Sequence, residues 1–181
     1  MTLEEMKYKV YAMIEEYNED EDDLTDDSDY ATKMNSVINQ IQNELSRLKK
    51  LPEYKSMEVT EGQIITLNSI DSNIYQLNVI KDVDYEMIGN TVLFKEDGTA
   101  RIYYYRYPKQ IDQDTPDTYK FELSDDVLEI MPYGVAGDLL KSDVSNQYGT
   151  VYYNRYQELK SQLDPRYSLG SIYIEGGFDL W

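Results

Sequence analysis

The spacing of apolar residues changes twice along this chain, and that change constrains the fold more than any other feature. Apolar residues recur at three- and four-residue steps in the first 50 residues, alternate with polar ones over 57–107, and return to helical spacing after residue 124. Helical spacing predicts amphipathic helices, and alternation predicts strands. The sequence therefore predicts an α+β protein in the order helix, helix, sheet, helix, helix.

Two helices are predicted ahead of the sheet. The first covers residues 3–17, where Thr2 followed by Glu4 and Glu5 suits a helix start with acids at the positive end of the dipole. The second ends shortly before Pro52. Their apolar stripes consist of Leu3, Met6, Val10, Met13, Ile14 and Tyr17 in the first, and of Ala31, Met34, Val37, Ile38, Ile41, Leu45 and Leu48 in the second.

An acidic segment, residues 19–29, separates these two helices and holds eight acids in eleven residues. Such a run of like charges repels itself and favours a solvated loop. Asn18, Asp20 and Asp22 match the first, third and fifth positions of a calcium loop, but Asp23 occupies the sixth, where the sharp turn needs glycine. We therefore expect a solvated loop here and no specific metal site.

The middle of the chain is predicted to form short antiparallel strands. The pairs Gly89-Asn90 and Asp97-Gly98 are typical of tight turns between such strands. The last predicted strand, residues 100–107, is rich in tyrosine and ends at Pro108. We expect a meander of four or five strands.

Two more helices are predicted after the sheet. The third opens at Ser124 and contains Pro132, which predicts a kink. Residues 134–137 read Gly-Val-Ala-Gly, a pattern that favours close helix packing over phosphate binding. The fourth helix opens at Asn146 and ends at the Asp-Pro pair 164–165.

Together these elements predict a helical bundle with an inserted small antiparallel β-domain and an extended C-terminal arm. The bundle would comprise residues 1–56 and 108–166, the β-domain residues 57–107, and the arm residues 167–181.

Composition excludes several functions. The net charge is −18, from 35 acids against 17 bases, which opposes general affinity for nucleic acid or anionic membranes. The chain has no Cys and no His, so disulfides, zinc sites built on these residues and the usual catalytic triads are excluded. No signal peptide or membrane-spanning segment is evident, so we expect the protein to be made in a cytosol. We expect no enzymatic activity and no cofactor.

The C-terminal segment, residues 168–181, is apolar and carries the only Trp of the chain. Fourteen extended residues reach about 45 Å, and an apolar segment of that length needs a groove. It either folds back on its own domain or docks into a neighbouring subunit or another protein. Its expected anchors are Ile172, Tyr173, Ile174, Phe178, Leu180 and Trp181.

Residues 119–140 and 152–166, with the strand ending at Pro108, resemble the head–tail connector, or adaptor, proteins of tailed bacteriophages. The resemblance spans roughly residues 30–166 and rests on apolar and aromatic signatures; the long acidic segment and Gly137 depart from the family pattern. It implies a structural virion protein, made in the host bacterial cytoplasm and located in the neck or tail region of the virion. It further implies a ring, commonly of twelve copies, between the portal protein and a tail or nozzle protein. DNA would pass through the acidic lumen without specific binding, and the C-terminal arm would dock on the portal.

Nineteen tyrosines suit surfaces that pair with other chains, although a half-buried sheet would also favour tyrosine. In a ring, one face of a subunit contacts a different face of the next. We expect these contacts on the last strand and on the fourth helix, at Tyr103, Tyr105, Tyr107, Tyr148, Tyr152 and Tyr156. The alternative function is a small acidic binding or regulatory module, such as an inhibitor that mimics DNA.

Overall fold

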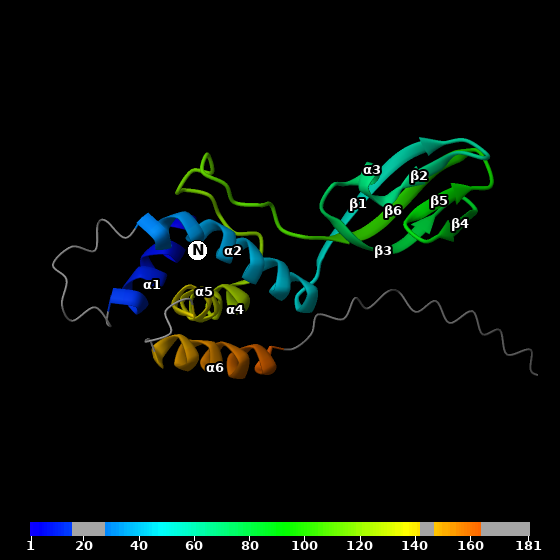
Figure 1. Cartoon of the computed structure of the whole chain (residues 1–181). Helices are drawn as coiled ribbons and strands as arrows, with labels where there is room; N and C mark the ends of the chain where they lie inside the picture. The colour runs from blue at the N-terminus through cyan, green and yellow to red at the C-terminus, as the bar shows by residue number, and fades with distance from the viewer. Residues whose placement is uncertain (16–27, 142–146, 164–181) are drawn as a thin grey trace, which may run out of the picture.

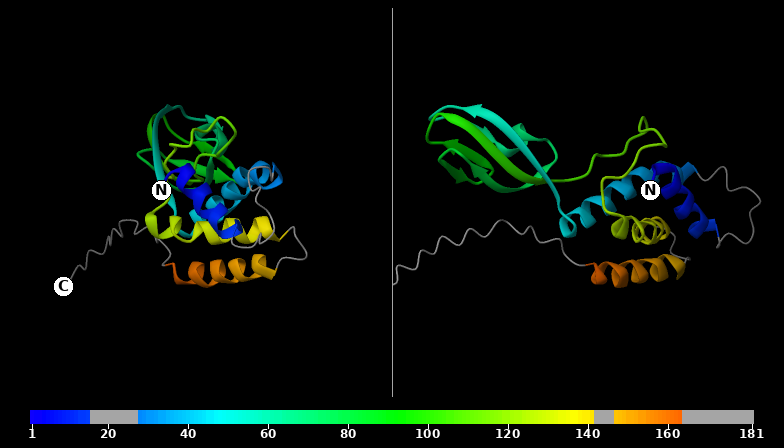
Figure 2. Two further views of the ribbon diagram at one scale, coloured as in Figure 1. Left: turned by 90° about the vertical axis from the view of Figure 1, so that its left-hand side faces the viewer. Right: turned by 180° about the vertical axis from the view of Figure 1, so that it is seen from behind.

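The computed structural model describes residues 1–15, 28–141 and 147–163. Apart from one short helix among the strands, the helices lie at one end of the molecule and the strands at the other (Figure 1), and the same division is evident from behind (Figure 2). Each end has its own buried apolar cluster. The acidic segment, apart from its last residues, and the C-terminal segment lie outside the described residues, so the predictions made for them stay predictions.

A short central helix, α5, organises the helical end. It is apolar around most of its circumference, and it packs against α1, α2, α4 and α6. A helix with apolar residues on all sides is stable only when other helices surround it. The helices of this end are α1 (Leu3–Glu15), α2 (Ser28–Leu48), α4 (Asp125–Leu128), α5 (Met131–Leu140) and α6 (Gln147–Gln162).

The start of α1 is capped as its sequence predicts. The Glu5 N–H donates to Oγ1 of Thr2 (3.2 Å), and the Thr2 N–H donates to Oε2 of Glu5 (2.9 Å). This reciprocal pair is a capping box, which satisfies backbone donors that the first turn leaves free.

The strands form two three-stranded antiparallel sheets. Their buried faces share one apolar cluster, which includes Val92 and Phe94 from one sheet and Ala100 and Ile102 from the other. The first sheet has the order β1 (Leu51–Val59), β6 (Gly98–Arg106), β3 (Ile74–Lys81), and the second has the order β2 (Ile64–Thr66), β5 (Thr91–Phe94), β4 (Tyr85–Ile88), with the short helix α3 (Leu67–Ile70) between β2 and β3.

The prediction of a helical bundle with an inserted small antiparallel β-domain is wrong, whereas the predicted extended arm lies outside the described residues. The structure is α+β only in the general sense: several helices and two small separate sheets. Figure 1 views α5 almost along its axis while α2 and α6 run across the page, so these helices cross and are not aligned as in a bundle. The strands do not form a single meander either, because β6 lies between β1 and β3 and its nine residues pair with the nine of β1.

Predictions of local structure were more accurate than the prediction of the overall fold. The turn at Gly89 joins β4 to β5 with a positive φ of 61°, as predicted. The predicted third helix is divided into α4 and α5, and Pro132 lies in the first turn of α5, where its missing N–H costs nothing. Strand β1 begins at Leu51, ahead of the predicted domain boundary at residue 57.

Amide side chains of α2 hold the segment that returns from the sheet to the helices. The Asn39 side chain donates to the Ile111 carbonyl (2.7 Å) and accepts from the Ile111 N–H (2.8 Å). Buried Gln42 donates to the Lys109 carbonyl (3.0 Å), and Asn35 donates to the Asp112 carbonyl (2.9 Å). A loop on a helix has no ladder of its own, so these side chains supply its backbone partners.

Candidate functional site: the outer face of the β1–β6–β3 sheet

Strand β6 places alternate side chains on opposite faces of its sheet. Ala100, Ile102 and Tyr104 are buried against the second sheet. Because side chains alternate along a strand, Tyr103 and Tyr105 lie on the other face. We call this second surface the outer face; it also carries Arg101, with Pro52 and Tyr54 of β1 and Gln76, Val79 and Lys81 of β3 opposite.

A partly exposed aromatic pair occupies the middle of the outer face. Tyr54 and Tyr103 are directly opposite in the register, and their rings stack with centroids 5.8 Å apart and planes 26° apart. The Lys81 Nζ lies 5.4 Å from the centroid of Tyr103, in a cation–π arrangement. Tyr54 is 61% exposed and Tyr103 is half-buried, so Tyr54 offers most of the area that a partner can reach.

Tyr105 lies deeper on the same face. Its side chain is only 3% exposed, and the Lys50 Nζ covers it at 4.5 Å from the ring centroid. Lys50 also donates to Oε1 of Gln76 (3.2 Å), which fixes the ammonium group over the ring. The buried hydroxyl of Tyr105 has no hydrogen-bond partner among the described residues. The ring is therefore covered by its own chain, and only Lys50 and Gln76 above it can offer contacts.

The outer face carries three cations, Lys50, Lys81 and Arg101, against the two acids Glu58 and Asp82. Lys50 and Lys81 lie on aromatic rings and form no ion pair among the described residues, whereas Arg101 is paired with Asp82, with Nη2 to Oδ1 at 2.9 Å. The pair lowers the pKa of Asp82 through the hydrogen bond from Arg101. With a net charge of −18 on the whole chain, this local excess of cations favours a partner that brings carboxylates.

Tyr107 fastens the outer face to the helices. The Arg47 Nε donates to its hydroxyl (3.1 Å), and its ring lies 4.7 Å from that of Tyr75. The Tyr75 hydroxyl donates in turn to the Ser46 carbonyl of α2 (3.2 Å). Burial, together with the neighbouring Tyr107, raises the pKa of Tyr75 to about 12, so the Tyr75 phenol stays neutral near neutral pH. Tyr107 therefore serves a contact within the chain.

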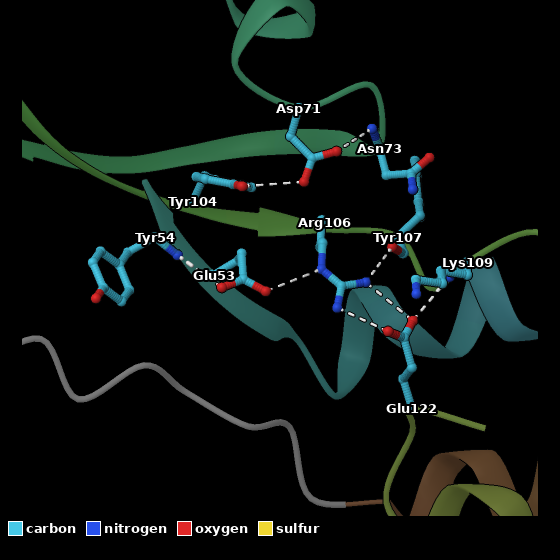
Figure 3. A network of polar contacts seen from close by, with 9 residues as sticks. All are labelled: Glu53, Tyr54, Asp71, Asn73, Tyr104, Arg106, Tyr107, Lys109 and Glu122. Atoms are coloured by element: carbon cyan, nitrogen blue, oxygen red, sulfur yellow. Dashed lines mark hydrogen bonds and ion pairs between the residues drawn. The ribbon is translucent and has the colours of Figure 1, made fainter. Parts of the chain in front are cut away.

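The other face of the sheet is fastened to the helices by an ion network around Arg106 (Figure 3). Its guanidinium contacts both carboxylate oxygens of Glu122 (2.9 and 3.0 Å) and reaches Glu53 at 3.5 Å. Glu122 also accepts the Lys109 N–H (2.9 Å). Burial alone would raise the pKa of Glu122, but Arg106 and this N–H outweigh it, and the pKa is lowered. The two fastenings hold the sheet in a defined orientation on the helices.

The three tyrosines predicted on the fourth helix do not share one surface. Tyr148 is 41% exposed, and Tyr152 is half-buried and donates to the Met13 carbonyl of α1 (3.0 Å). Tyr156 is fully buried, and burial with the nearby Glu44 carboxylate raises its pKa. Regular helical spacing grouped these residues, but α5 covers the side on which Tyr156 lies. Tyr105 and Tyr156 therefore have no exposed ring to offer, whereas Tyr148 is exposed and Tyr103 is half-buried.

Glycines of α5 explain why α6 lies so close. A Cβ on Gly137 would lie 2.9 Å from the Tyr153 nitrogen, and one on Gly134 would lie 3.0 Å from the Tyr156 ring. The predicted role of residues 134–137 in close helix packing is confirmed. These two helices carry most of the aromatic and apolar pattern on which the family resemblance rests.

Sequence reasoning missed Tyr54, which is the most exposed member of the site. From the sequence, Pro52 indicates the end of a helix, and residues 51–56 therefore fall outside the predicted sheet. Proline is tolerated on edge strands, and β1 is such a strand. The position of Lys50 and Lys81 on tyrosine rings was not predicted either, because the two lysines are far from each other in the sequence.

Among the described residues, no group of three or more acidic side chains is arranged to hold a metal ion. In the same part of the chain, no helix is long and apolar enough to cross a membrane. No known family model matches the sequence, and no curated protein matches it either.

Proposed function

We propose that this chain is a structural subunit of a head–tail adaptor ring of a tailed bacteriophage. The proposal is supported by the resemblance of residues 119–140 and 152–166 to that family. Both segments contribute to one packing unit, in which Tyr153 and Tyr156 of α6 lie on the glycines of α5.

The observation that carries the proposal is the stack of exposed Tyr54 on half-buried Tyr103. Tyrosine supplies a large contact area with little rotamer entropy to lose, and aromatic residues are enriched where proteins pair. Two stacked rings beneath a lysine form a compact patch, unlike the single exposed apolar residues that any protein carries. We assign this patch to the contact between neighbouring subunits.

A closed ring needs two different surfaces on each subunit. The outer face provides one. The exposed side of α6 is a suitable second surface, because Tyr148 and Val151 are exposed there and its Arg155 is neutralised by Glu158 (2.7 Å). A face with little net charge lowers the repulsion between copies that each carry −18.

The proposal is tested by mixing the purified chain with the portal protein of a tailed bacteriophage. Sedimentation and negative-stain images should show a ring on the portal, with twelve copies as the expected number. Tyr54→Ser should weaken ring formation at least about tenfold in concentration, because hot-spot aromatics cost 2 kcal/mol or more when removed. Tyr8→Ser is the matched control, since Tyr8 is 74% exposed on α1.

A chain that neither binds the portal nor forms rings would overturn the proposal. Competition with DNA for a DNA-binding enzyme would then favour the alternative of an acidic DNA mimic.

A further inference from the structure

Strand β1 leaves one long edge of its sheet open. It pairs with β6 on one side, and no other strand among the described residues pairs with its second side. The Tyr54 N–H donates to the neighbouring Glu53 carboxylate (3.3 Å), as expected for a backbone group that faces away from the sheet. Pro52 has no N–H to donate. An edge of this kind can accept an extended peptide beside it.

The outer face next to this edge selects the chemistry of such a peptide. Tyr54 and Tyr103 offer aromatic surface, and the ammonium groups of Lys50 and Lys81, which form no ion pair among the described residues, offer positive charge. A fitting peptide therefore carries aromatic and branched apolar side chains together with carboxylates, and no lysine or arginine.

Residues 168–181 of this chain have that composition. Their large apolar side chains are separated by glycines, and their only charged side chains are Glu175 and Asp179. The stretch 172–175 reads Ile-Tyr-Ile-Glu, with β-branched and aromatic residues that suit a strand. The positive charges of the outer face and the negative charges of residues 168–181 are thus complementary.

We propose that residues 168–181 of a second copy bind along β1 and over the Tyr54–Tyr103 stack. The inference rests on the proposed ring, in which each copy meets a different face of the next. It makes the C-terminal segment a link between subunits and leaves portal contact to other surfaces. Lys50 and Lys81 receive the carboxylates, and Tyr54 is the central aromatic contact.

The only tryptophan, Trp181, lies in this segment and gives a direct probe. A synthetic peptide of residues 168–181 is titrated with the full-length Trp181→Phe chain, which is then silent in tryptophan fluorescence. The anisotropy of the peptide should rise with saturable binding. The double variant Tyr54→Ser and Lys81→Glu should weaken that binding at least about tenfold.

The matched control is the double variant Tyr8→Ser and Lys9→Glu, which removes an exposed tyrosine and reverses a charge on α1. It should bind the peptide like the parent chain. A peptide with Glu175→Lys and Asp179→Lys should bind more weakly, and the loss should shrink at high salt. Absent binding, or equal binding to both double variants, overturns the inference.

Dilution of the unaltered chain distinguishes binding of the segment to a second copy from binding within the same copy. Trp181 emission should shift to longer wavelength on dilution, because a segment held by another copy is released. An emission that does not change with concentration, while the peptide competes for the site, shows binding within one chain and contradicts the proposal. Rings on the portal without peptide binding would overturn this inference alone, whereas peptide binding without any portal ring would overturn the proposed function.

Discussion

A β-carbon on Gly137 would lie 2.9 Å from the backbone nitrogen of Tyr153, closer than any ordinary contact. The two residues belong to α5 and α6, so the glycine sets how closely these helices approach. Backbone atoms cannot move aside as a flexible side chain can.

Gly137→Ala should therefore destabilise the protein, although alanine favours helices. We expect a loss of about 1–3 kcal/mol in the free energy of unfolding, the range for overpacked cores. Urea denaturation measures it. Thr150→Ala, at an exposed position of α6, is the control and should change stability by less than about 0.5 kcal/mol. Equal stability of Gly137→Ala and the parent chain would mean that the helices separate at no cost.

Arg106→Met should break the network at the junction of sheet and helices. It leaves Glu122 half-buried without its cation, and we expect a loss of about 2–4 kcal/mol. Arg155→Met removes an exposed pair with Glu158 and should cost about 0.5 kcal/mol or less. Similar losses for both variants, again by urea denaturation, would show that the junction gains nothing from its ion network.

The same network predicts a dependence on pH. The folded-state pKa of Glu122 is lowered, so its contribution is present above the unfolded-state pKa and is lost as pH falls through the folded-state value. The parent chain should be more stable than Glu122→Gln near neutral pH, and the difference should shrink below about pH 4.5. Unfolding curves of both proteins at several pH values test this. A difference that stays constant, or grows, on acidification would contradict the lowered pKa.

Two adjacent tyrosines should respond in opposite ways to loss of their hydroxyl. The Tyr104 hydroxyl donates to Oδ2 of Asp71 (3.1 Å), so Tyr104→Phe should cost about 1 kcal/mol. The Tyr105 hydroxyl is buried without a partner among the described residues, so Tyr105→Phe should be neutral or stabilise slightly. Thermal unfolding of both variants measures the contrast. A larger loss for Tyr105→Phe would mean that its hydroxyl has a partner that the structure does not show.

Signals that depend on neighbours in the sequence predicted local structure correctly. Thr2 and Glu5 form the expected cap, Gly89 the expected turn, and residues 134–137 the expected close contact. Each depends on groups a few residues apart or on the absence of a side chain. The predicted bundle was wrong because periodicity reports which side of a helix is apolar and does not report the direction in which helices cross.

The candidate site was likewise predicted only in part. The tyrosine-rich strand was recognised from its sequence, but not which of its tyrosines are exposed. Tyr103 stacks on Tyr54, Tyr105 is covered by Lys50, and Tyr107 is held by Arg47. These partners come from β1, from α2 and from the residues between them, which only the folded chain brings beside β6.

The sequence by itself determined the charge of this protein, its order of helices and strands, and the absence of Cys and His chemistry. These properties follow from residue types and local spacing. Only the tertiary structure decided that β6 is the central strand, that α5 is enclosed by other helices, and that cations gather on the outer face. Those depend on pairings between segments distant in the chain, where the burial of shared apolar surface selects one arrangement among many that local propensity allows equally.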